Sequence, residues 1–246
     1  MSLGPDPEFR PLGGKAYGSI PHLPGSRTGA ADRHLSHSHA RICTERARDA
    51  QDHVVVLEKL DGSCVAAARI GETIMALGRE GRLAASSPNA ARRLWAAWVA
   101  MNAERFLATL QPGERIVGEW LALAHGTRYA LRHEPFVCFD LLRGNERLPW
   151  HELVLRSRAG GFVVPGLIHE GGPLSIEAAM ARLAEGGSHG AIDPVEGAVW
   201  RVERRTGDAS RVDFLAKYVR PDKVDGSLLP ENTGRPAVWN WRPEPS

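Results

Sequence analysis

The alternation of apolar and polar positions predicts a meander of short antiparallel strands in the first third of the chain. The runs at residues 53–58, 64–70 and 73–78 are rich in valine, alanine or isoleucine, and an Asp-Gly turn and a Gly-Glu turn separate them. Further strand-like runs lie at residues 115–121, 127–131, 135–142, 195–203 and 211–219. We therefore expect mostly antiparallel sheets.

Between these strands, some segments have apolar residues at the spacing of an α-helix. From Asn89 to Leu107 the apolar residues recur every three or four positions, which predicts one long amphipathic helix whose tryptophans lie in the core. Shorter helices are expected at residues 149–157 and after Ser175, a good N-cap, with the glycine pair 186–187 as the stop. Helices inserted into an antiparallel set of strands indicate the α+β class.

Composition narrows the function classes. The 246 residues are 43% hydrophobic, which is enough for one large domain or two small ones. A net charge of +2 excludes the strongly basic balance of a protein that coats nucleic acid, so any site for a polyanion must be a local patch. No apolar run approaches the ~20 residues that span a bilayer, and the three cysteines are widely spaced. We expect a soluble, cytoplasmic protein without a membrane segment.

The most informative chemistry lies at residues 58–63, EKLDGS, directly after the apolar run 54–57. A lysine between a buried strand and a glycine turn is partly desolvated, which lowers its pKa and frees the lone pair for attack. Lys59 is therefore our candidate nucleophile. The same Lys-x-Asp-Gly pattern recurs at Lys223, but a turn-rich stretch without a preceding strand surrounds that copy. We interpret the second copy as a solvated turn.

The pattern at Lys59 resembles motif I of the covalent nucleotidyltransferases, the superfamily of ATP-dependent polynucleotide ligases and mRNA capping enzymes. In these enzymes the motif I lysine takes a nucleoside monophosphate from a nucleoside triphosphate. Other segments resemble the later motifs of the superfamily in the same order, and the resemblance extends from Glu58 to Arg220. These segments are residues 78–81 (GREG), 117–120 (VGEW), 136–142 (FVCFDLL), 195–201 (VEGAVWR) and 214–220 (FLAKYVR).

The resemblance implies a fold and a set of roles. The fold is a nucleotidyltransferase (ATP-grasp-like ligase) core of mostly antiparallel sheets with flanking helices. Lys59 and Lys217 are the implied catalytic residues, Glu196 faces Mg²⁺, and ATP is the nucleotide. The residues implied to bind the nucleotide are Glu58, Arg79, Glu119, Phe139, Glu196 and Lys217. Taken singly, Glu119 and Glu196 could also be exposed strand carboxylates, and Phe139 could be a core residue.

Two departures from the superfamily pattern matter. The segment at Lys217 has one lysine where relatives often have two, so part of the phosphate grip falls to Arg220 or to another residue. About 26 residues follow that segment, which leaves no room for a C-terminal OB domain. This favours the RNA ligase branch, and residues 17–27 and 32–36 resemble the leader of RNA-ligase-like proteins.

We therefore expect an ATP-dependent RNA ligase that seals 5′-phosphate and 3′-hydroxyl ends of nicked or pre-aligned RNA through a lysyl-AMP intermediate. The expected limits are an N-terminal arm at 1–50, the nucleotidyltransferase domain at 51–225 and a tail at 226–246. A DNA ligase, a GTP-dependent capping enzyme and a non-catalytic nucleotide-binding module remain as alternatives, and the oligomeric state stays open. Three closely spaced histidines, His34, His37 and His39, are not interpreted as a metal site, since no carboxylate or thiolate lies at useful spacing. We interpret them as part of a solvated loop or helix start.

Overall fold

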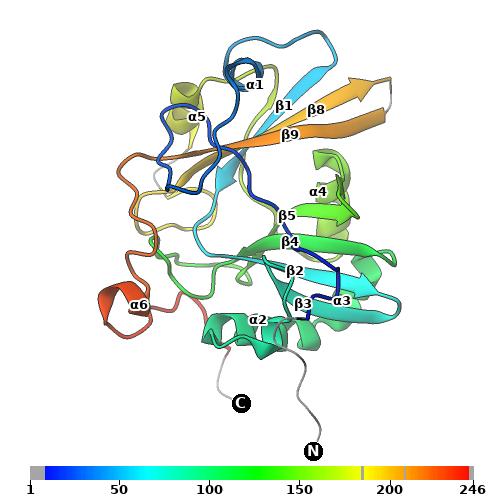
Figure 1. The fold of residues 1–246 in the computed structure, drawn as a ribbon, viewed down its shortest axis with the longest axis vertical. Coiled ribbons are helices and arrows are strands. Elements are labelled where there is room, and N and C mark those ends of the chain that lie inside the picture. The colour runs from blue at the N-terminus through cyan, green and yellow to red at the C-terminus, as the bar shows by residue number, and fades with distance from the viewer. Residues whose placement is uncertain (1–8, 184–185, 208, 244–246) are drawn as a thin grey trace, which may run out of the picture. The chain divides into compact units, whose positions relative to one another are not determined.

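The computed structural model describes residues 9–183, 186–207 and 209–243. Its α+β class, with helices beside two antiparallel sheets, is the class that the sequence predicts (Figure 1). The chain divides into two compact units, each built from separate stretches of sequence. Of the described residues, unit 1 contains those up to Gly18, Ser63–Leu123 and Glu134–Val164. Unit 2 contains Ser19–Gly62, Ala124–His133 and the described residues from Pro165 onward.

Unit 1 is a five-stranded sheet in the order β3-β2-β4-β5-β6. Its helices place an aromatic core on the sheet. The Trp95 ring lies 4.7 Å from that of Phe136 and 5.3 Å from that of Trp120, and its indole N–H donates to the carbonyl of Ala66. The helix tryptophans Trp95 and Trp98 are buried, as the sequence predicts. The elements are β2 (Ser63–Ile70), β3 (Thr73–Gly78), η1 (Ala84–Ser86), α2 (Ala90–Met101), α3 (Ala103–Thr109), β4 (Glu114–Trp120), β5 (Phe136–Arg143), β6 (Glu146–Arg147) and α4 (Trp150–Ala159).

The single long helix predicted from Asn89 to Leu107 is wrong, because α2 ends at Met101 and α3 begins at Ala103. Asn102 separates them. Its side-chain amide donates to the carbonyl of Trp98 at 2.8 Å, and its amide oxygen accepts from Arg105. An asparagine side chain that bonds to a backbone carbonyl four residues earlier competes with the hydrogen bonds of the helix and offers the chain an alternative to continuing it. The apolar spacing persists across the break, so hydrophobic periodicity alone could not reveal it.

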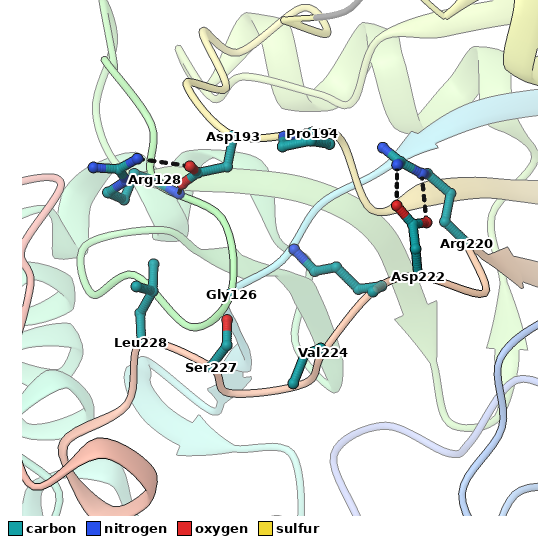
Figure 2. A pocket seen from close by; sticks show the side chains of 10 residues that line it. Gly126, Arg128, Asp193, Pro194, Arg220, Asp222, Val224, Ser227 and Leu228 are labelled. Carbon is teal, nitrogen blue, oxygen red and sulfur yellow. Dashed lines mark hydrogen bonds and ion pairs between the residues drawn. The ribbon is translucent and has the colours of Figure 1, made fainter.

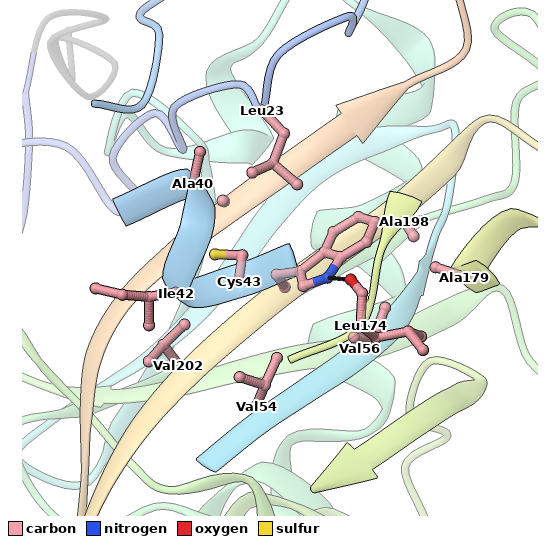
Figure 3. Close-up of a cluster of buried hydrophobic side chains, with 12 residues drawn as sticks. Leu23, Ala40, Ile42, Cys43, Val54, Val56, Leu174, Ala179, Ala198 and Val202 are labelled. Atoms are coloured by element: carbon pink, nitrogen blue, oxygen red, sulfur yellow. Dashed lines mark hydrogen bonds between the residues drawn. The ribbon is translucent and has the colours of Figure 1, made fainter. Parts of the chain in front are cut away.

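Unit 2 is a four-stranded antiparallel sheet in the order β7-β1-β8-β9. Its helices contribute to a cluster of buried hydrophobic side chains (Figure 3). Trp200 belongs to this cluster, and its indole N–H donates to the carbonyl of Leu174 at 2.9 Å. Val54 and Val56 face this cluster, while Val55 and Leu57 are also buried, which explains the continuous apolar run in β1. The elements are α1 (His37–Thr44), β1 (Asp52–Lys59), β7 (Leu167–Gly171), α5 (Ile176–Arg182), β8 (Gly197–Thr206), β9 (Ala209–Val219) and α6 (Pro230–Thr233).

Three local predictions in unit 2 have clear outcomes. Ser175 caps α5 as predicted, since its hydroxyl accepts the N–H of Ala178 at 3.1 Å. That helix ends at Arg182, before the predicted glycine stop, and residues 184–185 lie outside the described residues. The strand predicted at 127–131 is wrong. Only Tyr129 forms an isolated bridge, to Ala191, because the backbone and side chains of this loop bind other loops instead.

Residues 19–50, predicted as part of an N-terminal arm, belong to unit 2, and α1 contributes Ile42 and Cys43 to its core. The predicted domain limits stay a prediction, since compactness alone does not show which segments fold independently. In the part of the chain that the structure describes, no helix is both long enough and apolar enough to cross a membrane.

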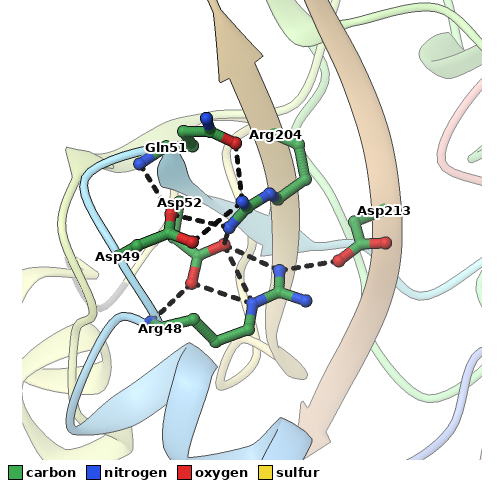
Figure 4. A network of polar contacts seen from close by, with 6 residues as sticks. All are labelled: Arg48, Asp49, Gln51, Asp52, Arg204 and Asp213. Carbon is green, nitrogen blue, oxygen red and sulfur yellow. Dashed lines mark hydrogen bonds and ion pairs between the residues drawn. The ribbon is translucent and has the colours of Figure 1, made fainter.

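A network of charged side chains, which we call the β1 clasp, fixes the start of β1 to β8 and β9 (Figure 4). Its centre is Asp52, whose carboxylate accepts hydrogen bonds of 2.7 Å from both Arg48 and Arg204. Arg48 also donates to Asp213 of β9 at 2.6 Å. Burial opposes the ionisation of Asp52, but the hydrogen bonds from the two arginines outweigh it and lower its pKa to about 2. The ionised carboxylate therefore stabilises the folded state.

We expect Asp52→Asn to lower the free energy of unfolding by about 2 kcal/mol at pH 7. The pKa is lower in the folded protein than in the unfolded chain, so this contribution is complete above about pH 5 and is lost as the pH falls toward 2. Urea unfolding of both proteins at several pH values measures it. Asp49→Asn, which changes an exposed carboxylate of the same clasp, is the matched control and should have little effect. A stability difference that is the same at pH 7 and pH 2 would contradict the assignment.

Candidate active site

Lys59 and Glu196 are brought together by the register of β1 against β8. Lys59 is the last residue of β1 and lies opposite Gly197, the first residue of β8. The Lys59 amine donates to the Glu196 carboxylate at 2.6 Å and approaches the carbonyl of Leu60 at 3.4 Å. The lysine side chain is 21% exposed and that of the glutamate 8%. The candidate nucleophile is thus held by a carboxylate that lies 137 positions away in the sequence.

The electrostatics of this pair are set by its burial. Desolvation raises the pKa of Glu196, and the Lys59 ammonium opposes that rise. The Glu196 carboxylate is therefore a hydrogen-bond acceptor that lies within reach of the proton that the Lys59 amine must lose before it can attack. The close approach of β8 and β9 supports the geometry. A Cβ atom at Gly197 would lie 2.0 Å from the carbonyl oxygen of Tyr218, so the residue after Glu196 must be glycine for the strands to keep this spacing.

Glu58 precedes Lys59 and its side chain has separate partners. Its carboxylate is buried and accepts the backbone N–H of Ser188 at 2.7 Å. Burial raises the pKa of Glu58, and the bond from Ser188 opposes the rise. A Cβ atom at Gly187 would lie 2.0 Å from the same carboxylate, so the loop around Ser188 closes tightly over it. Successive side chains of a strand point to opposite faces, which separates Glu58 from Lys59.

Lys217 lies on β9 beside a segment of the predicted arm. Residues 21–27 run along β9, where the N–H of Lys217 donates to Pro21, and the N–H groups of Leu23 and Arg27 donate to Lys217 and Val219. The Lys217 amine is 3.9 Å from the carboxylate of Asp32.

His22 and Asp32 are two residues near Lys217 that sequence reasoning did not assign to the site. His22 is buried, and its Nε2 atom lies 3.4 Å from the Asp32 carboxylate. Burial lowers the pKa of His22, and the nearby Lys217 ammonium lowers it further. Residues 17–27 and 32–36 resemble the leader of RNA-ligase-like proteins, but no pattern in the sequence predicts that the first of these segments pairs with β9.

The second Lys-x-Asp-Gly copy corrects one of our interpretations. Residues around Lys223 do form a turn, but its side chain is buried rather than solvated. The Lys223 amine lies 2.8 Å from the carboxylate of Asp61 and donates to the hydroxyl of Thr127. A buried lysine is tolerated where a carboxylate compensates its charge, and Asp61 of the first copy provides that carboxylate.

Lys223 is one of the residues that line a pocket of about 310 Å³, which Figure 2 shows from close by. Arg128 and Arg220 line it, and each is engaged by a carboxylate, Asp193 and Asp222 respectively. Arg220 was the suggested substitute for a second phosphate-gripping lysine. Its guanidinium makes two bonds to Asp222, of 3.1 and 2.5 Å, so it would have to exchange this partner to bind a phosphate.

The remaining predicted site residues, Arg79, Glu119 and Phe139, belong to unit 1. Arg79 follows β3 with an exposed side chain, and its carbonyl accepts the N–H groups of Ala16 and Tyr17. Glu119 is half-buried on β4, opposite Cys64 of β2 and Val137 of β5. Phe139 is half-buried on β5, and the ring of Tyr17 meets it edge-on at 5.3 Å. Its ring is thus partly open to solvent and is not a core side chain.

Comparison with known proteins gives one family match. The model of a family described as RNA ligase matches residues 52–219, a range that includes Lys59, Glu196 and Lys217. No curated protein matches the sequence.

Solved structures of the RNA ligase from Naegleria gruberi are similar in fold. One mutant with AMP and Mn is 18% identical, with a TM-score of 0.51 over 79% of this chain and 59% of that one. Another mutant, with ATP and Mn, is 19% identical, with a TM-score of 0.49 over 81% of this chain and 60% of that one. The chain therefore spans about three fifths of the length of these relatives.

The close approach at Gly197 leads to a test of the strand geometry that holds Glu196. We expect Gly197→Ala to lower the free energy of unfolding by about 2 kcal/mol, because the added methyl group forces β9 away from β8. Urea unfolding monitored by tryptophan fluorescence measures the change. Gly172→Ala is the control, since a Cβ atom there meets nothing within 4 Å. Equal stability of the two variants would show that the strands adjust without loss.

Proposed function

Because the chain belongs to the RNA ligase family, we propose that it is an ATP-dependent RNA ligase that seals 5′-phosphate and 3′-hydroxyl ends through a lysyl-AMP intermediate. The observation that carries the proposal is the 2.6 Å contact between Lys59 and the buried Glu196. Both residues lie within the segment that matches the family. A partly buried lysine beside a proton acceptor has the surroundings that a nucleophilic amine requires.

The first step would begin with loss of a proton from the Lys59 ammonium, for which Glu196 lies within hydrogen-bond reach. The lone pair of the amine then attacks the α-phosphorus of ATP. The N–P bond forms as the bond to the bridging oxygen breaks, and pyrophosphate leaves. In the second step a 5′-phosphate oxygen of RNA displaces the lysine and takes the AMP. In the third, the 3′-hydroxyl attacks that 5′-phosphate and AMP leaves.

The residues at this site offer a divalent metal ion few protein ligands. Glu196 offers a carboxylate oxygen, and within the described residues no group of three or more His, Cys, Asp or Glu side chains could hold an ion. Mg²⁺ commonly binds through one or two carboxylates and completes its shell with substrate phosphates and water. Bound there, Mg²⁺ would neutralise charge on the phosphates as pyrophosphate leaves. The similar ligase structures contain Mn, which supports a divalent ion without deciding which one.

The other predicted residues keep roles that the family resemblance suggests. Lys217 is proposed to bind the α-phosphate. Its side chain is 20% exposed, so a ligand can reach it. Phe139 is proposed to stack on the adenine base, for which its half-buried ring is suitable. Arg79, Glu119 and Glu58 are likewise proposed, each by itself, to bind the nucleotide.

RNA is the proposed partner, held as a nick or as pre-aligned ends. A net charge of +2 offers few phosphate contacts, so binding should be weak and sensitive to salt. We also propose the reducing cytoplasm as the compartment, because the three cysteines, Cys43, Cys64 and Cys138, are odd in number and too widely spaced to suggest a disulfide framework. The non-catalytic binding module and the capping enzyme remain as alternatives that the next experiment separates.

We expect ATP with Mg²⁺ to leave an acid-labile, base-stable phosphoramidate on the protein, and Lys59→Ala to abolish it. The chain has only four lysines, so the modified residue is easily mapped. Labelling with α-³²P-ATP and a denaturing gel measure the adduct. Lys15→Ala is the matched control, since that side chain is 59% exposed and pairs with Glu80 at the surface. Full labelling of Lys59→Ala would exclude this nucleophile, and preference for GTP would favour a capping enzyme.

A second test addresses the substrate. We expect faster sealing of a nick whose 3′-hydroxyl strand ends in two ribonucleotides than of the same nick ending in deoxynucleotides, because A-form geometry and the terminal 2′-hydroxyl distinguish RNA. The adenylylated 5′ strand is supplied in advance, so that only the last step is compared. Equal rates would remove the case for RNA specificity. Absence of sealing on both nicks, with lysyl-AMP still formed, would indicate another acceptor or a missing partner protein.

A further inference from the structure

We propose that Lys223 is a positioning residue: its ammonium holds Asp61, two residues after the nucleophile, and thereby fixes the direction in which Lys59 projects. The inference rests on the proposed function and assigns to the second Lys-x-Asp-Gly copy a role in the same site. It also makes Lys223 unsuitable as an inert control in labelling experiments.

The contact between Lys223 and Asp61 is short and enclosed. Their charged atoms lie 2.8 Å apart, and the two side chains are 8% and 12% exposed. A surface ion pair of this kind would constrain little, because water competes for both groups. A buried pair behaves differently, since removing either partner leaves the other charge without compensation.

Asp61 is held by further bonds that fix its position. Its carboxylate also accepts the N–H of Gly126 at 2.9 Å, and its own N–H donates to the hydroxyl of Tyr129 at 3.0 Å. The approach at Gly126 leaves no spare room, because a Cβ atom there would lie 2.8 Å from the carbonyl of Val224. The turn at Asp61 is therefore enclosed by the loop at 126–129 and by the segment that carries Lys223.

The backbone and the ammonium group of Lys223 are both placed for this buried contact with Asp61 and not for exposure at the surface. Its backbone N–H donates to the carbonyl of Arg220, which turns the chain inward after β9. An ammonium has three protons, and two of them are used by Asp61 and Thr127, the latter fully buried. The aspartate of the second copy differs, since Asp225 is 73% exposed and pairs with Arg27.

These contacts act on Lys59 through the backbone. A single residue, Leu60, separates Lys59 from Asp61, and Leu60 is buried. With Lys59 fixed on one side by the pairing of β1 with β8, and Asp61 fixed on the other by Lys223, the backbone between them has little freedom. Loss of the ion pair should therefore release the turn and disorient the amine without removing any group that touches ATP in the proposed mechanism.

The experiment compares Lys223→Met, Asp61→Asn and the double variant by single-turnover labelling with ATP and Mg²⁺. We expect Lys223→Met to slow labelling at saturating ATP by at least ~10-fold, since misplacing a nucleophile is costly, while the ATP concentration for half-maximal rate changes by less than ~3-fold. The double variant should recover to within ~3-fold of the wild type. It removes both charges, and the asparagine keeps an acceptor for Gly126.

Melting curves of all variants show whether they are folded at the assay temperature, and Lys15→Met controls for loss of a surface lysine. Lys223→Met that is folded and labels at the wild-type rate would overturn the proposal, as would a double variant no faster than the single ones. If the wild type itself does not label, the proposed function fails. Hydrogen exchange of the peptide containing residues 57–63 then decides the positioning role, which predicts faster exchange in Lys223→Met and is excluded by unchanged exchange.

Discussion

The antiparallel register between β1 and β8 is the constraint on which the candidate active site depends. It sets Val56 opposite Trp200 in the core and, three residues later, Lys59 opposite Gly197. A slip of one residue would turn every side chain of β1 to the other face. Because Trp200 is fully buried and anchored by its bond to Leu174, such a slip is strongly opposed. The core of unit 2 thus determines which carboxylate meets the lysine.

Two pairs of opposite charges lie near the candidate nucleophile. Lys59 meets Glu196 at 2.6 Å, and Lys223 meets Asp61 at 2.8 Å. Pairing lets lysines lie among apolar strands and loops without an isolated charge. The first pair would supply the chemistry of adenylyl transfer, whereas the second would supply rigidity. The β1 clasp does the same at the opposite end of β1, where two arginines satisfy Asp52.

Local patterns predicted some parts of this structure well and others poorly. The strands before and after Lys59 were placed to within one residue, since valine and alanine runs bounded by glycine turns have few alternative structures. The break at Asn102 and the irregular loop at 127–131 were missed. In each, side-chain bonds to backbone decide the conformation, and hydrophobic spacing carries no information about them.

The sequence by itself determined the α+β class and, through ordered motifs, the family. It also favoured Lys59 over Lys223 as the nucleophile, which stays a prediction. These conclusions depend on residue types and on the pattern of apolar and polar residues among neighbouring positions, which the sequence displays directly. Only the tertiary structure decided that Lys223 is buried against Asp61, and that His22 and Asp32 lie beside Lys217. Such contacts join segments more than a hundred residues apart, and their energies arise from desolvation and charge compensation in a packed interior, which no local pattern encodes.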